Sequence, residues 1–157
     1  MELSKRSLAI FSLGWLTSLI LVGCIAGYYY MKYQNLLQTL KEYESCVIHV
    51  NICIDYKEWN GTIVWYNNTI VPIGCDLLSA TKKIAVVNCT YWPSYQSYFV
   101  DAINNVWKND HEGKYWMWYQ WTGEGWRYGQ DAADDYILSP NETVMWRYEK
   151  PHYSPQG

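Results

Sequence analysis

Aromatic side chains dominate residues 114–129, "KYWMWYQWTGEGWRYG", which hold four Trp and three Tyr around a glycine-containing turn. Trp and Tyr join a large apolar ring to a polar N–H or O–H, so they suit half-buried faces, interfaces and ligand platforms. Since side chains alternate along a strand, Trp116 and Trp118 share one side of this hairpin. The other side holds the alternate residues, Tyr115, Met117, Tyr119 and Trp121.

A sheet covered by a single helix buries only one of these rows well, so the second row needs an explanation. Residues 88–97 could cover it with Tyr91, Trp92 and Tyr95 as a second small core. Alternatively, the row is a platform for a flat or ring-shaped ligand or for sugar faces, or it binds a protein partner. The candidate ligand-binding residues are Trp116, Trp118, Trp121, Trp126, Tyr98 and Arg127, the arginine as a stacking or anion-pairing group.

Catalytic motifs do not occur in the sequence. It has no nucleophile elbow, phosphate-binding loop or dinucleotide fingerprint, and its three histidines, at 49, 111 and 152, are too scattered for a zinc site. The acidic residues within 131–135 lack the spacing of a calcium loop and are interpreted as solvated. The formal net charge of −3 does not favour nucleic acid. We therefore expect neither an enzyme nor a metal site, and no nucleic-acid partner.

Cysteines and glycosylation sequons indicate an oxidising, extracytoplasmic location. Beyond the apolar N-terminal segment lie Cys46, Cys53, Cys75 and Cys89, and an even number predicts two disulfides with three connectivities open. Sequons of the form N-x-[ST] begin at Asn60, Asn67, Asn88 and Asn141, all in stretches that read as turns. Together these features predict a glycosylated surface protein.

The order of the secondary-structure patterns predicts the fold. Strand patterns at 46–56 and 62–66 precede a helical pattern at 74–87, and strands are expected again at 97–107, within 114–129, and at 142–150. This order predicts an α+β fold, a β-grasp-like mixed sheet with one helix across it. A helix running beside the first strand favours the disulfides Cys46–Cys75 and Cys53–Cys89. Cys75–Cys89 would have to span the helix, which is too long for one bridge.

An apolar segment at the N-terminus predicts membrane attachment. Residues 8–30 carry no charge and follow a basic N-terminus, so they are long enough to span a bilayer with residues 1–7 in the cytoplasm. Residues 31–45 continue as a short helical stalk, and 151–157 form a flexible tail. Gly23 and Gly27 permit close helix packing, hence a homo-oligomer. The alternative is a lipoprotein cleaved and lipidated at Cys24.

The outer part of the chain resembles the C-terminal domain of the transcobalamin and intrinsic factor family, over about residues 46–150. The residues that carry the likeness are "VPIGCDLL" at 71–78, "AINNV" at 102–106 and "KYWMWY" at 114–119. The chain is similar to small prokaryotic or archaeal surface proteins that carry this domain alone. It departs from the family at 139–143, where "SPNET" stands in place of a Gly-Asp turn.

The resemblance implies a β-grasp-like domain that binds a ligand without catalysis. In the vitamin carriers it covers one side of cobalamin, so a cobalamin-like ligand is implied here, although no cofactor is certain. A second, large helical domain covers the other side in those carriers, and this chain has no room for it. We expect a single-pass, extracytoplasmic ligand-binding module. The alternative is a structural or interaction protein whose aromatic face packs on a partner subunit or envelope layer.

Overall fold

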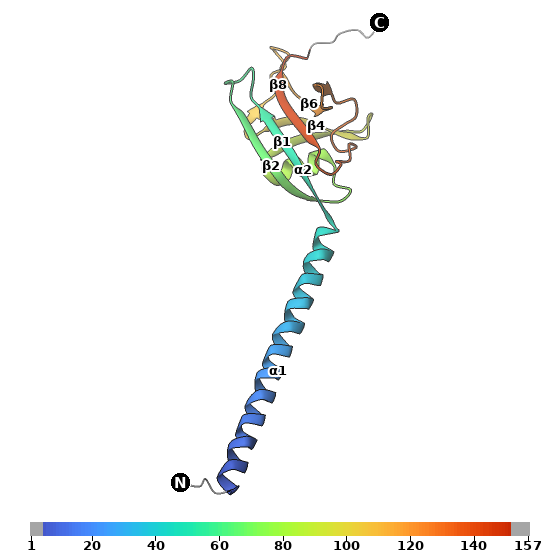
Figure 1. Cartoon of the computed structure of the whole chain (residues 1–157). Coiled ribbons are helices and arrows are strands. Elements are labelled where there is room, and N and C mark those ends of the chain that lie inside the picture. The colour runs from blue at the N-terminus through green and yellow to red at the C-terminus, as the bar shows by residue number, and fades with distance from the viewer. Residues whose placement is uncertain (1–4, 152–157) are drawn as a thin grey trace. The chain divides into compact units, whose positions relative to one another are not determined.

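The structure, a computed structural model, describes residues 5–151, and their side chains from residue 13 onward. The chain divides into two compact units, residues 1–45 and 46–157 (Figure 1). The flexible tail expected at 151–157 and the cytoplasmic segment expected at 1–7 lie largely outside the described residues.

The first unit consists of one helix, α1 (Lys5–Glu44). The expected span at 8–30 and stalk at 31–45 therefore form one continuous helix. Residues 13–44 are long and apolar enough to cross a membrane by length and composition, and none of the most apolar stretch is buried against protein. The described side chains of this helix are almost all exposed.

The second unit contains a five-stranded mixed sheet. Its strands lie in the order β2 (Ile63–Pro72), β1 (Val47–Asp55), β8 (Thr143–Glu149), β6 (Tyr115–Trp121) and β7 (Trp126–Tyr128). Strand β8 returns parallel to β1, with Ile52 opposite Val144, whereas the other neighbours are antiparallel. The α+β fold with a mixed sheet is thus confirmed.

Helix α2 (Leu77–Ile84) packs on one face of this sheet. Asp76 begins it, because its carboxylate accepts a hydrogen bond from the Ser79 amide at 2.7 Å. Leu77, Leu78 and Thr81 are buried, and the Thr81 hydroxyl accepts the indole N–H of Trp146 at 2.8 Å. The helix is shorter than the expected 74–87, because Ala85 adopts an extended conformation and β3 begins soon after.

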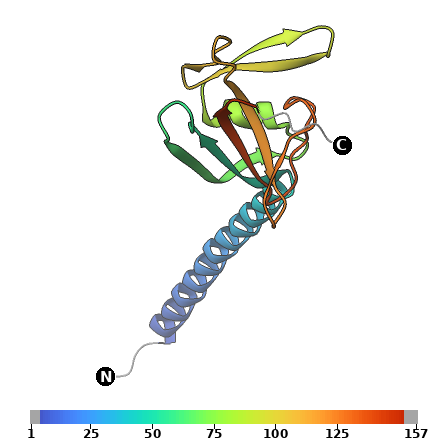
Figure 2. The same ribbon diagram turned by 90° about the horizontal axis from the view of Figure 1, so that it is seen from above.

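A second sheet of three strands accounts for the segment that follows α2. It contains β3 (Val87–Trp92), β4 (Ser97–Ile103) and β5 (Val106–Trp107), in that order, and Figure 2 shows the β3–β4 hairpin projecting beyond α2. The prediction of a loop at 88–97 is wrong, since residues 88–92 belong to β3 and only 93–96 form a turn. The strand expected at 97–107 is two strands joined by a turn at Asn104 and Asn105, both with positive φ.

The hydrophobic core lies between the five-stranded sheet, α2 and β4. From β1 it receives the alternate residues Ile48, Val50, Ile52 and Ile54, and Tyr56 follows just beyond the strand. Strand alternation then places Cys53 on the opposite face, whereas Cys89 packs against the core.

No cysteine pair within residues 5–151 forms a disulfide. The predicted bridge Cys53–Cys89 is not formed in the structure, where Cys53 lies on the face of β1 that points away from the core and Cys89 packs against the core. Cys46 and Cys75 lie at one end of the sheet, where the Ile73 amide donates to the Cys46 carbonyl at 3.0 Å. Their bridge is not formed in the structure and stays a prediction.

A bulge interrupts β2 where a break was expected. The β1–β2 register shifts between Val50 and Ile52, and Asn68 has a φ of 56°. The Asn51 side chain holds this bulge, because its Oδ1 accepts the Asn68 amide at 2.9 Å. The strand therefore continues to Pro72 instead of ending at residue 66.

All four sequon asparagines are exposed. Asn60 and Asn141 lie outside the strands, as expected, but Asn67 lies at the bulge of β2 and Asn88 in β3. The expectation that all four sit in turns is therefore wrong for these two.

Candidate ligand-binding clefts

Trp116 and Trp118 form the inner row of β6, and both are buried. The indole N–H of Trp116 donates to the Val106 carbonyl at 2.8 Å, and that of Trp118 donates to the Asp131 carbonyl at 3.0 Å. The ring of Trp116 also packs edge-on against Tyr56, with 5.4 Å between centroids. Because their polar atoms already have partners, these two rings act first as core residues.

Trp118 is held tightly from two sides. Its ring lies 4.4 Å from that of Tyr136, centroid to centroid. Across the ring, a Cβ built on Gly129 would lie only 2.0 Å from Cε2 of Trp118, so only glycine fits at this approach. Tyr136 donates a hydrogen bond to Glu142, and burial followed by that bond raises the pKa of the Tyr136 hydroxyl. The indole position is thus fixed by its neighbours.

The larger cleft, of about 590 Å³, lies between β4 and β6 and is closed at one end by residues 128–133. Buried groups, among them Val100, Trp116 and Trp118, line its inner part. Its outer walls are aromatic and come from four segments of the chain. They comprise Trp92, Tyr95, Tyr98, Phe99, Tyr115 and Tyr128. A volume of this size suits a small-molecule ligand.

The aromatic wall of this cleft is continuous. Phe99 lies at its centre, 6.2 Å from Trp92 and 6.1 Å from Tyr115 between ring centroids. Tyr98 packs on Tyr91 at 5.1 Å and is still 43% exposed. Exposed rings of this kind present flat apolar surface to a ligand.

Charged groups lie at one side of the same cleft. Lys108 forms ion pairs of 3.6 Å with Asp101 and with Asp110, and its ammonium lies 5.4 Å from the Phe99 ring centroid. Asp131 also lines the cleft. The lining of the cleft therefore includes one cation, Lys108, and two carboxylates, Asp110 and Asp131, beside an apolar wall.

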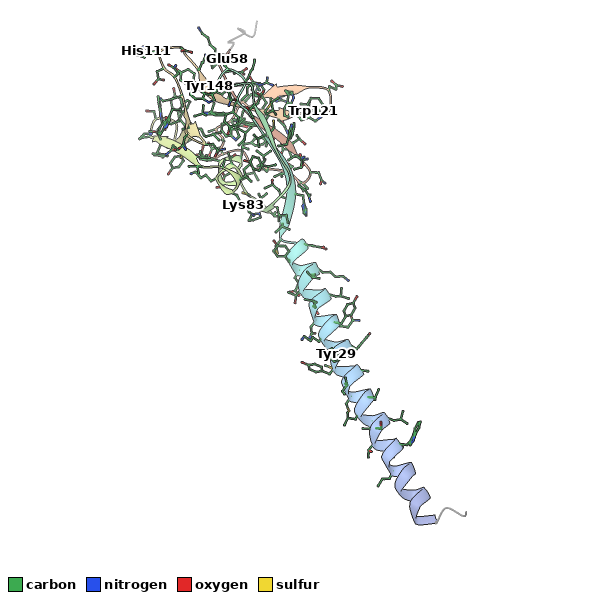
Figure 3. The ribbon with its side chains drawn as sticks, turned by 90° about the vertical axis from the view of Figure 1, so that its left-hand side faces the viewer. Tyr29, Glu58, Lys83, His111, Trp121 and Tyr148 are labelled. Carbon is green, nitrogen blue, oxygen red and sulfur yellow. The ribbon has the colours of Figure 1, made fainter. Side chains whose placement is uncertain are left out.

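A second groove, of about 450 Å³, lies on the opposite face of the five-stranded sheet. Three tryptophans line it, Trp65, Trp121 and Trp126, with Asn51, Asn67 and Thr143 as the polar part. The Trp121 and Trp126 rings are 5.3 Å apart, and Trp65 lies 6.4 Å from Trp126. In Figure 3, α2 with Lys83 lies on one side of the sheet and Trp121 projects on the other.

A polar network covers the rest of this outer face. Arg147 donates to Asp55 at 2.8 Å and stacks over the Tyr119 ring, while Tyr119 donates its hydroxyl proton to Glu149. Burial and then the bond to Glu149 raise the pKa of Tyr119. Beside this network, burial and the charge of Asp55 raise the pKa of the Cys53 thiol to about 11. Cys53 is therefore a neutral, unreactive thiol at neutral pH.

The structure divides the sequence-predicted site residues between these places. Tyr98 lies in the larger cleft together with Trp116 and Trp118, whereas Trp121 and Trp126 lie in the groove on the other face. Arg127 is exposed on β7 and lines neither, and its charge acts on Tyr136. Within the described part of the chain, no cluster of three His, Cys, Asp or Glu could hold a metal ion.

Sequence reasoning missed Phe99, Lys108 and Trp65 as lining residues, and it named Tyr115 only as a member of an aromatic row. Trp65 had a signal, because it alternates with the inward residues of the strand pattern at 62–66. Phe99 and Lys108 had none, since they approach β6 only in the folded chain.

Comparison with known proteins supports the fold. No family model matches the chain, and no curated protein matches it by sequence. Among solved structures, haptocorrin in complex with Cbi is similar with a TM-score of 0.57 and 17% identity, over 68% of this chain. The match spans only 26% of haptocorrin. A proposed metal-binding protein of Ruminococcus gnavus ATCC 29149 aligns with a TM-score of 0.49 and 10% identity over 67% of this chain and 99% of that protein. The likeness to haptocorrin agrees with a transcobalamin C-terminal-domain-like fold.

Proposed function

We propose that the second unit is a non-catalytic ligand-binding module whose site is the cleft between β4 and β6. The observation that carries the proposal is the continuous wall of partly exposed aromatic rings beside Lys108 and its carboxylates. Such a wall suits the face of a planar ring, and the charged side suits polar groups on its edge. The fold likeness to haptocorrin, a binding protein crystallised with Cbi, supports a corrinoid-like ring as the ligand class.

Membrane display of this module is part of the proposal. An apolar helix of this length supports an uncleaved anchor that leaves residues 46–157 outside the cytoplasm. The tight, buried positions of Trp116 and Trp118 support a role as the floor of the cleft, and we infer that Tyr95, Tyr98 and Phe99 are the principal ligand contacts.

Ligand titration of the full chain in detergent micelles tests the site. Cobalamin, cobinamide and haem are added separately while tryptophan fluorescence is recorded, and calorimetry checks each result free of inner-filter effects. We expect saturable binding of a corrinoid, and at least a tenfold higher Kd in the double variant Tyr95→Ala, Tyr98→Ala. Both residues are exposed, so the variant should keep its fold.

Trp59→Ala is the matched control, because Trp59 is 61% exposed and lines neither cleft. It should bind with unchanged affinity. An unaltered Kd in the double variant would mean that the ligand binds outside the cleft between β4 and β6. If neither cobalamin, cobinamide nor haem binds to the folded wild-type chain, the proposed ligand class is contradicted.

A further inference from the structure

The groove on the outer face is formed by tryptophans on three strands around a sequon. Trp65 precedes Asn67 by two residues in β2, so both side chains emerge on the same face of the sheet. Trp121 and Trp126 face each other across the β6–β7 hairpin in register. The groove between these three rings is thus lined by Asn67 itself.

Two of the three tryptophans present exposed apolar surface at this groove. Trp65 is 47% exposed and Trp121 43% exposed, whereas Trp126 is half-buried next to both, and the ion pairs of Arg147 and Glu149 lie on the same face. Exposed indoles that border one groove indicate a surface that is covered by another group. The tilt of 37° between Trp65 and Trp126 leaves their rings as two walls of one groove instead of a closed stack.

Polar groups lie where a sugar would need them. Asn51 donates to the Thr143 hydroxyl at 3.2 Å, and both residues line the groove together with Asn67. A sugar presents an apolar C–H face and a rim of hydroxyls, which matches indole walls flanked by amides and a hydroxyl. Asn67 is exposed, and the bulge at Asn68 turns the backbone at this position.

We propose that Asn67 carries an N-linked glycan whose first sugars fold back into the groove of Trp65, Trp121 and Trp126. The inference rests on the proposed extracytoplasmic location of this unit. Attachment uses a lipid-diphosphate-linked oligosaccharide. The Nδ2 atom of Asn67 bonds to the sugar C1, the bond from C1 to the phosphate oxygen breaks, and the amide proton passes to a base of the transferase. No redox step is involved.

The other sequons provide the contrast. Asn60, Asn88 and Asn141 are exposed, and none of them lines this groove or the larger cleft. A glycan at those positions extends into solvent, whereas one at Asn67 begins between aromatic walls. Only the glycan at Asn67 is therefore expected to stabilise the fold through ring contacts.

The test uses the full chain produced in a host that glycosylates secreted proteins and in a host that does not. Peptide mapping by mass spectrometry measures occupancy at each sequon, and thermal unfolding in detergent micelles gives the midpoint. The effect of Asn67→Gln in the second host is subtracted from its effect in the first, which leaves the glycan's own contribution. The same pair of measurements is then repeated in a Trp121→Ala background, with Asn88→Gln as the matched control.

We expect Asn67 to be occupied and its glycan to raise the midpoint by about 3 °C, a shift equivalent to one good aromatic contact in a domain of this size. The shift should vanish with Trp121→Ala, and Asn88→Gln should give none. A glycan-dependent midpoint shift of equal size with Trp121 and with Trp121→Ala would overturn the inference. So would an Asn67 without glycan in a chain whose other sequons carry it. Either result would leave the proposed location intact. Four empty sequons would contradict both the inference and the proposed location.

Discussion

Three buried indoles place their N–H groups on oxygens from three different segments. Trp116 donates to Val106, Trp118 to Asp131, and Trp146 to the Thr81 hydroxyl. A buried N–H without a partner would cost about 1–3 kcal/mol, so each bond selects one position for a bulky ring. These bonds tie β6 to β5 and to the segment at 128–133, and they tie β8 to α2, so they hold the inner wall of the larger cleft in place.

The position of the Trp118 ring depends most closely on Gly129. Replacing Gly129 with Ala would place a methyl group 2.0 Å from the Trp118 ring, which Tyr136 and Asp131 hold from the other side. We expect Gly129→Ala to lower the free energy of unfolding by about 3 kcal/mol, because the ring must leave its position.

Urea unfolding followed by tryptophan fluorescence measures this loss. Gly125→Ala is the control, because a Cβ there meets nothing within 4 Å. It should change stability by less than about 0.5 kcal/mol. Equal stability of the two variants would show that Trp118 is not confined as described.

Tyr119 connects stability to alkaline pH. Its hydroxyl donates to Glu149, a buried carboxylate that also pairs with Lys57 at 3.0 Å. Because the pKa of Tyr119 is raised in the folded state, the unfolded chain loses this proton first as pH rises. The contribution of the Tyr119 hydroxyl to the free energy of unfolding is therefore complete below about pH 10 and is lost as the pH rises above it.

Tyr119→Phe should cost about 2 kcal/mol at pH 7, the value of a hydrogen bond to a charged acceptor. Above pH 10 its stability should fall less steeply than that of the wild type. Denaturant unfolding at pH 7 and in steps from pH 9.5 to 11.5 measures both effects, with the exposed Tyr95→Phe as control. Parallel curves for Tyr119→Phe and wild type above pH 10 would contradict the linkage.

The hairpin turn between β4 and β5 shows how one element depends on local backbone conformation. Asn104 and Asn105 have φ of 49° and 64°, as in the two-residue turns that suit the twist of a hairpin. Asn104 also bonds outward, accepting the Val86 amide at 3.0 Å and donating to the Tyr56 hydroxyl at 2.9 Å. Asn105 makes the turn without those tertiary bonds.

We therefore expect two substitutions at Asn105 to differ in their effect on stability. Asn105→Gly should leave stability within about 0.5 kcal/mol of the wild type, because glycine accepts positive φ freely. Asn105→Val should cost about 1–2 kcal/mol, since a β-branched residue is strained in this region. Thermal unfolding of the two variants measures this difference in stability. A valine variant as stable as the glycine variant would mean that the turn rearranges without cost.

Alternation and turn residues predicted most strands, but not the faces that they bury. In β6 both rows are aromatic, so the sequence could not say that Trp116 and Trp118 are the buried ones; that depends on carbonyls of Val106 and Asp131 that only the folded chain brings near. Strand β3 was missed because its sequon and the following Pro93 resemble a loop, and its strand character comes from pairing with β4. The predicted site residues divide between two clefts for the same reason, because the sequence did not show which face of each strand they occupy.

At the scale of the whole molecule, the character of α1 bears on where the second unit resides. The helix is continuous to Glu44, with an apolar segment long enough for a membrane, and the folded unit begins at Val47. Such a helix serves either as an uncleaved anchor or as a signal sequence, and a lipid anchor at Cys24 is the third case. The three cases differ in the mass of the chain that remains attached to the membrane.

We expect the full chain of 18.5 kDa, before any added glycan, to stay with the membrane pellet after an alkaline carbonate wash. Its physical basis is the uncharged stretch of α1, whose transfer to water would expose a membrane-length apolar surface. Intact-mass measurement of the extracted, deglycosylated chain identifies the case. A chain that begins at Cys24 and carries lipid would replace the helical anchor with a lipid anchor, and a shortened chain in the wash would make residues before the cut a signal sequence. Deleting residues 1–45 should release the folded unit in every case, because its core consists of residues from β1, α2 and the strands beyond them.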